Sequence, residues 1–191
     1  MPLRNAPPEP WLSFLKELDA LATSTARMDC IGGFVVTMLY GLGRATADLD
    51  VLEIAPQAAS EAFGRTAMLG GELYKKYGLY LDRVTVAQAP YEYESRLVEM
   101  FPGVFRNLRL MALDPYDLAL TKLERNIERD RNDIRYLART LPFNLSILRE
   151  RYQNELRPYL GNPKREDLTM QLWIEAIEED RAGLSAETGG A

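Results

Sequence analysis

The sequence contains no histidine and only one cysteine, Cys30. Without histidine there is no Ser-His or Cys-His nucleophilic device, no imidazole metal site and no histidine general base. A single cysteine excludes an internal disulfide and a zinc site built from several thiolates. Cys30 precedes the apolar Ile31, which is typical of a buried small side chain rather than a nucleophile. Any chemistry must therefore use carboxylates, lysine, hydroxyl groups or a metal ion held by oxygen.

Long apolar runs and a positive net charge are also absent. No run approaches the ~18 apolar residues of a membrane-spanning helix, and the first ten residues lack the apolar centre and cleavage site of a secretory signal. We therefore expect a cytoplasmic protein without membrane contact. A net charge of −5 argues against the whole chain attracting nucleic acid. Basic residues recur between Arg106 and Arg135 with acids interleaved, so a local basic face and a solvated helix surface both stay open.

The first half of the chain alternates helical and strand patterns. With 191 residues, the chain is long enough for one domain with a helical appendage. Apolar spacing and glycine positions predict helices over 10–23, 34–40 and 57–77, the last broken at Gly70-Gly71, and a weaker helix over 93–100. Short runs bounded by turn residues predict strands over 28–31, 47–54, 79–86 and 107–112.

The second half is predicted to be helical. After Asp114-Pro115, where an aspartate can cap a helix and a proline suits its first position, helical patterns continue to about residue 180. They form three segments, separated at 141–142 and at 161–163. We predict an α+β fold of α/β-like character. Its parts are an α/β core with an N-terminal helix (1–112), a helical segment packed on it (113–181) and a disordered tail (182–191).

Two aspartates on one predicted strand are the main candidates for chemistry. Residues two apart in a strand point to the same face, so Asp48 and Asp50 project side by side, whereas Glu53 falls on the opposite face of a regular strand. Two such carboxylates repel each other unless a cation compensates, and hard oxygen ligands suit Mg²⁺ or Mn²⁺. Asp82 adds a third carboxylate if its strand lies beside the first. Three carboxylates on neighbouring strands can hold metal ions that activate a hydroxyl and neutralise a departing pyrophosphate.

A glycine pair precedes this strand. Gly32-Gly33 follows a predicted strand, and without Cβ atoms the backbone can come close to an anionic group such as a triphosphate. Arg44 and Thr46 supply a cation and a hydroxyl just before the acidic strand, for the phosphates or for fixing the loop.

The order of these residues resembles a known signature. Ile31-Gly-Gly, a helix, and Arg44-Ala-Thr-Ala-Asp-Leu-Asp50 resemble the nucleotidyltransferase superfamily, of the DNA polymerase beta-like fold, in which an Asp-x-Asp strand follows a glycine turn. Residues 113–134 resemble a second motif of abortive-infection toxin-like and other minimal nucleotidyltransferases, with a lysine and a downstream aspartate on one helix. The similarity spans roughly residues 28–137. It implies a small mixed sheet flanked by helices, followed by the helical C-terminal segment.

Helical spacing also supports the second motif. Four polar residues fall on one predicted helical stripe beside an apolar one: Lys122, Asn126, Arg129 and Asp133, next to Leu123, Ile127 and Ile134. On this interpretation Lys122 meets a triphosphate or a base, and Asp133 positions Lys122 or accepts a proton. The alternative is an exposed helix carrying ion pairs, Asp130 included.

The resemblance implies an enzyme that transfers a nucleoside monophosphate from a triphosphate such as ATP to a hydroxyl. It places metal at Asp48, Asp50 and Asp82, and triphosphate at Gly32, Gly33, Arg44, Thr46 and Lys122. The acceptor stays open between RNA, a protein and a small molecule, and a toxin restrained by an antitoxin partner is implied by the family alone. The alternative is an inactive module that binds a nucleotide or a protein, because bulky Phe34 replaces the small hydroxyl residue often found after the glycine pair. Leu172, Trp173 and Ile177 form a stripe that covers the core or contacts a second copy in a homodimer.

Overall fold

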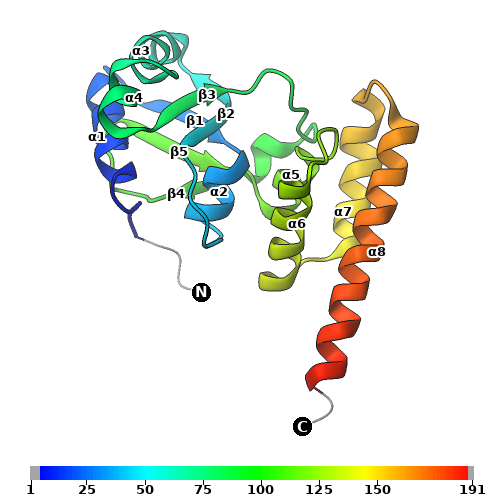
Figure 1. The fold of residues 1–191 in the computed structure, drawn as a ribbon. Coiled ribbons are helices and arrows are strands. Elements are labelled where there is room, and N and C mark those ends of the chain that lie inside the picture. Colours follow the sequence, from blue (N-terminus) through cyan, green and yellow to red (C-terminus); the bar gives the residue numbers. More distant parts are fainter. Residues whose placement is uncertain (1–4, 189–191) are drawn as a thin grey trace. The chain divides into compact units, whose positions relative to one another are not determined.

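The computed structural model describes residues 5–188, with side chains up to residue 184 (Figure 1). The chain divides into two compact units. Of the described residues, the first unit comprises 5–87 and 94–114, and the second comprises 88–93 and 115–188. The chain therefore passes between the units at three points.

The first unit is built on a five-stranded mixed sheet of order β3-β2-β1-β5-β4. Its strands are β1 (Ala26–Cys30), β2 (Asp48–Ala55), β3 (Tyr80–Arg83), β4 (Val98–Met100) and β5 (Leu108–Ala112). β1 runs parallel to β5 and antiparallel to β2, β2 runs parallel to β3, and β4 runs antiparallel to β5. The predicted fold class, a small mixed sheet with helices and a helical C-terminal part, is confirmed.

The helices of the first unit are α1 (Trp11–Leu21), α2 (Gly32–Met38), α3 (Gln57–Ala67) and α4 (Glu72–Tyr77). In Figure 1, α1, α3 and α4 lie beside one another at the sheet. α1 buries Trp11, Phe14, Leu15 and Leu18, which its helical spacing places on one face. The predicted break at Gly70-Gly71 separates α3 from α4.

The weak helix predicted over 93–100 is wrong for most of its length. A single turn of 3-10 helix (η1, Tyr93–Arg96) is followed by β4, in which Met100 pairs with Leu110 of β5. Pairing with a neighbouring strand outweighs the weak local preference of this segment.

The two faces of the sheet differ in chemistry. Met28, Cys30, Leu49, Val51 and Leu110 are fully buried on one face, and burying an apolar side chain of this size contributes roughly 1.5–3 kcal/mol. The other face carries the charged residues, since strand residues alternate between faces. The core therefore lies on one side of the sheet and leaves the other for polar groups.

A β-bulge interrupts the pairing of β1 with β2. Asp29 pairs with Glu53, whereas the next residue, Cys30, pairs with Val51, so Leu52 is the extra residue. Paired residues point to the same face, and Glu53 therefore shares the face of Asp29. That face is opposite Val51, and Asp50 lies on it too. The prediction that Glu53 points away from the aspartate pair is wrong, because it assumed a regular strand.

The second unit is helical. It contains α5 (Pro115–Leu120), α6 (Glu128–Thr140), α7 (Leu145–Arg151) and α8 (Pro163–Thr188), with a π-helical turn η2 (Tyr152–Leu156) and a 3-10 turn η3 (Arg157–Tyr159) between α7 and α8. The breaks predicted near 141–142 and 161–163 are present. α8 continues to Thr188, in contrast to the disordered tail predicted from 182, and the last three residues lie outside the described part.

A break that the sequence did not predict separates α5 from α6. The polypeptide turns over residues 121–127, and Asn126 adopts a left-handed conformation with φ 44°. Lys122 and Asp133 therefore do not share a helix, and the predicted single polar stripe is wrong. Asp130 accepts a hydrogen bond from the backbone N–H of Ile127 at 3.3 Å, which caps the start of α6.

Residues 88–93 join the second unit although they precede most of it in the chain. The backbone N–H of Tyr91 donates to the carbonyl of Glu155 at 3.0 Å. The rings of Tyr91 and Tyr159 stack with centroids 5.9 Å apart.

In the described part of the chain, no helix is both long and apolar enough to cross a membrane.

Candidate functional site

Three carboxylates occupy one face of two neighbouring strands. Asp48 and Asp50 are partly exposed on β2, and Asp82 on β3 is the register partner of Asp50. Residues in register on adjacent strands project to the same face, so the pairing aligns Asp82 with the aspartate pair. Within residues 5–184, no three acidic, histidine or cysteine side chains gather closely enough to hold a metal ion. The three carboxylates thus share a face without meeting at one point.

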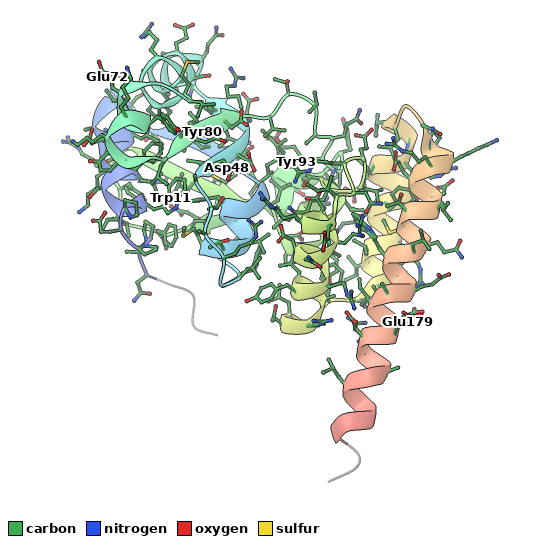
Figure 2. All side chains as sticks on the ribbon, viewed as in Figure 1. Trp11, Asp48, Glu72, Tyr80, Tyr93 and Glu179 are labelled. Carbon is green, nitrogen blue, oxygen red and sulfur yellow. The ribbon has the colours of Figure 1, made fainter. Side chains whose placement is uncertain are left out.

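Two hydroxyl groups accompany these carboxylates. Thr46 Oγ1 donates to Asp48 Oδ1 at 2.5 Å, which fixes that carboxylate. Tyr80 is the register partner of Asp48, and Figure 2 labels both residues. Burial raises the pKa of the Tyr80 phenol, and the negative charges of Asp48, Asp82 and Asp50 raise it further. All three carboxylates therefore act on a single hydroxyl group.

The glycine pair lies against this acidic face. Gly32 has φ 70°, and a Cβ atom built on it would lie 1.9 Å from Asp50 Oδ2. A Cβ atom on Gly33 would lie 2.8 Å from Arg44 Nη2. The backbone N–H of Ile31 also donates to the carbonyl of Asp50 at 2.9 Å. The Asp50 carboxylate and the Arg44 guanidinium can lie this close to the turn only because Gly32 and Gly33 have no side chains.

Lys122 and Asp133 form a buried ion pair in the second unit. Lys122 Nζ lies 3.0 Å from Asp133 Oδ2 and 3.4 Å from Asp130 Oδ1, and the lysine is 3% exposed. Burial favours a raised pKa for Asp130, but the hydrogen bonds from Arg125 and the charges of Lys122 and Arg125 outweigh it and lower this pKa. Two carboxylates thus hold the ammonium group inside the helical unit.

The other residues of the predicted second motif have different surroundings. Asn126 Oδ1 accepts a hydrogen bond from the indole N–H of Trp173 at 3.0 Å, and Arg129 is exposed. Leu123 and Ile134 are buried, whereas Ile127 is 46% exposed. The turn at Asn126 explains this division, since it removes the common helical axis on which the stripe was predicted.

Sequence reasoning missed one buried charge on the polar face of the sheet. Asp29 is fully buried and accepts two hydrogen bonds from Arg27, at 2.7 and 2.6 Å. Arg27 also pairs with Glu94 at 3.0 Å. Two opposite charges two residues apart in a strand were the available signal. Neighbouring Cys30 is buried as predicted, and burial, followed by the charge of Asp29, raises the pKa of its thiol, which disfavours the thiolate form.

The glycine turn thus lies against Asp50, with Asp48 two residues away on β2 and Asp82 in register on β3. The chain belongs to the family described as nucleotidyltransferase of unknown function (DUF6036), whose sequence pattern matches residues 11–181.

Other comparisons are distant. A crystal structure of JHP933 from Helicobacter pylori is similar at 15% identity over 92% of this chain and 95% of that one, with a TM-score of 0.34. No curated protein matches the chain.

Proposed function

We propose that this protein is a metal-dependent nucleotidyltransferase that moves a nucleoside monophosphate from a nucleoside triphosphate to a hydroxyl group. Family membership supports the reaction class. The observation that carries the assignment of residues is the contact of the Asp50 carboxylate with Gly32, on the face that also bears Asp48 and Asp82.

The donor set suits a hard divalent cation. Asp48 and Asp50 present carboxylate oxygens side by side, and Asp82 follows in register on β3. Mg²⁺ and Mn²⁺ prefer such ligands, and a cation offsets the repulsion of like charges at this spacing. In our proposal Asp48 and Asp50 hold the ion, which when bound would neutralise negative charge on the triphosphate, and Asp82 accepts a proton instead.

The chain's own residues supply the other roles. Gly32 and Gly33 let the triphosphate approach the backbone, and Arg44, whose guanidinium lies at Gly33, pairs with phosphate oxygens. The acceptor oxygen attacks the α-phosphorus, the bond from this phosphorus to the bridging oxygen of the β-phosphate breaks, and pyrophosphate leaves. Asp82, the most exposed of the three carboxylates, takes the proton of the acceptor hydroxyl.

The buried ion pair of the second unit has a supporting role in this proposal. Lys122 donates to Asp133 and Asp130 and is nearly inaccessible, with 4% of its side chain exposed. The sequence resemblance assigns Lys122 to the triphosphate and Asp133 to its positioning. We retain Asp133 as the group that positions Lys122.

A second candidate function is an inactive module that binds a nucleotide or a protein. Two observations favour it. Asp48, Asp50 and Asp82 do not lie close enough together to hold a metal ion in the described part of the chain. Phe34, directly after the glycine pair, is fully buried, and its phenyl ring has no polar group to offer a phosphate.

The acceptor in this reaction is a molecule that presents a hydroxyl group. An RNA end, a protein hydroxyl and a small molecule all present the required group. A toxin restrained by an antitoxin partner is one role that an RNA or protein acceptor would fit.

The test is a transfer assay with each radiolabelled nucleoside triphosphate, Mg²⁺ or Mn²⁺, and total cellular RNA, cell protein or pooled small hydroxyl compounds as acceptor, with pyrophosphate release measured in parallel. The Asp48→Asn/Asp50→Asn variant removes both charges without changing size. Glu72→Gln is the matched control, because Glu72 is exposed at the start of α4 (Figure 2). We expect metal-dependent transfer in the wild type and in Glu72→Gln, but none in the double variant.

Binding separates the two candidate functions. A thermal shift on adding triphosphate and Mg²⁺, with no transfer and no pyrophosphate release for any nucleotide, would establish the inactive module. Transfer that persists in the Asp48→Asn/Asp50→Asn variant would contradict the assigned site.

A further inference from the structure

The aspartate pair of β2 has different neighbours on its two sides. On the side of β1 lie the Gly32-Gly33 turn and the Arg44 guanidinium, the groups suited to a triphosphate. On the other side lies β3, the edge strand of the sheet, which carries Tyr80 and Asp82 in register with Asp48 and Asp50. In a displacement at phosphorus, the attacking oxygen and the leaving group lie on opposite sides of the phosphoryl group. The acceptor therefore belongs on the β3 side.

Tyr80 already places a hydroxyl group there. The side chain points to the same face as Asp48, because the two residues are paired in register. The ring packs edge-on against Tyr74, with centroids 5.9 Å apart, which restricts its orientation. Tyr80 is partly exposed, and within the described residues its hydroxyl makes no hydrogen bond. The Tyr80 ring is thus restrained by packing, and its hydroxyl group is on the face that carries the three carboxylates.

Other hydroxyl groups of the chain are less suitable. The Thr46 hydroxyl donates to Asp48 at 2.5 Å, so it is already used in fixing a carboxylate. Tyr74 belongs to α4 and not to the sheet. Tyr91, although 69% exposed, belongs to the second unit.

We propose that Tyr80 is a self-modification site, at which the protein transfers a nucleoside monophosphate to its own phenol. This inference rests on the proposed function. The Tyr80 Oη atom attacks the α-phosphorus of a bound nucleoside triphosphate, the bond to the β-phosphate breaks, and pyrophosphate leaves. The phenol proton passes to Asp82, two residues along the same face of β3. The product is a phosphodiester between Tyr80 and the nucleoside, which covers the acceptor side of the site and blocks further acceptors.

The experiment uses the intact protein without any added acceptor. Wild type, Tyr80→Phe, Tyr91→Phe and Asp48→Asn/Asp50→Asn are incubated with each α-labelled nucleoside triphosphate and Mg²⁺ or Mn²⁺. Protein-bound label is counted, and the labelled peptide is identified by mass spectrometry. A thermal shift on adding triphosphate shows that each variant still folds and binds. We expect label on Tyr80 in the wild type and in Tyr91→Phe, and its loss in Tyr80→Phe to the level of the double aspartate variant.

The outcomes separate this inference from the proposed function. Label that maps to another residue, or that persists in Tyr80→Phe, overturns the inference. So does an unlabelled wild-type protein that transfers nucleotide to an added acceptor, although the proposed function then stands. An absence of both self-labelling and transfer to any added acceptor overturns the two together.

Discussion

Replacing Gly32 by alanine tests the closest contact of the candidate site. The added Cβ atom would lie 1.9 Å from Asp50 Oδ2 and 2.8 Å from Asp50 Cγ, far inside van der Waals contact. The backbone at Gly32 also has φ 70°, a conformation that costs a residue with a side chain roughly 1–2 kcal/mol. The Asp50 carboxylate must therefore move away from the turn or the turn must change conformation.

We expect two measurable effects. The free energy of unfolding in urea should fall by about 1–3 kcal/mol, which combines the backbone cost with displacement of Asp50. Transferase activity should fall to near that of the Asp48→Asn/Asp50→Asn variant, because the carboxylate no longer occupies its place. Gly64→Ala is the matched control. Among the described residues, no atom lies within 4 Å of the added Cβ in the interior of α3, and alanine there should stabilise the helix by about 1 kcal/mol.

A Gly32→Ala protein with wild-type stability and activity would refute this reasoning. It would mean that Asp50 does not rest against the turn, and the assignment of the site would lose its main support.

Three further predictions concern the charges that hold the fold. Lys122→Met leaves two buried carboxylates without their shared cation, so the free energy of unfolding should fall by about 3–5 kcal/mol; a loss below about 1 kcal/mol in urea titration would argue against the buried pair. Hydrogen bonds from Arg135 and Arg139 lower the pKa of Asp180 from 3.8 to about 2. The contribution of Asp180 to the free energy of unfolding is therefore complete above pH 3.8 and is lost as the pH falls towards 2. Between these pH values, the free energy of unfolding should change less with pH in Asp180→Asn than in the wild type. Equal dependence on pH in the two proteins would contradict this prediction. Asp19 accepts three backbone N–H groups at the start of β5, so Asp19→Ala should cost about 1–3 kcal/mol without abolishing triphosphate binding, as measured by thermal shift.

The sequence was sufficient for those parts of the site that depend on local geometry. Alternation along a strand places Asp48 and Asp50 on one face, whatever the neighbouring strands are. The turn at Gly32-Gly33 follows from residues that tolerate close backbone approach. The position of Asp82 was conditional, because it requires that β3 pair with β2, and that pairing joins segments about thirty residues apart in the chain.

The errors arose where pairing or a single backbone angle decides the outcome. The bulge at Leu52 turns Glu53 to the acidic face. It exists only because the register between β1 and β2 shifts by one residue at this point. The helix expected to carry both Lys122 and Asp133 is interrupted by the left-handed Asn126, although asparagine tolerates that conformation better than most residues. The two side chains meet nevertheless, at 3.0 Å, through the turn rather than along a helix.

The three passages of the chain between the units limit how this protein can be divided. A fragment ending at Asp114 would keep residues 88–93 but lose their partners Glu155 and Tyr159, and a fragment beginning at Pro115 would lack the segment that docks on η2 and η3. Neither unit can therefore be produced as a complete fragment by cutting the chain at one position, or be moved intact into another protein by a single fusion. Exchange of the helical unit between relatives would have to carry this short segment with it, and so the sheet and the helices are expected to be inherited together.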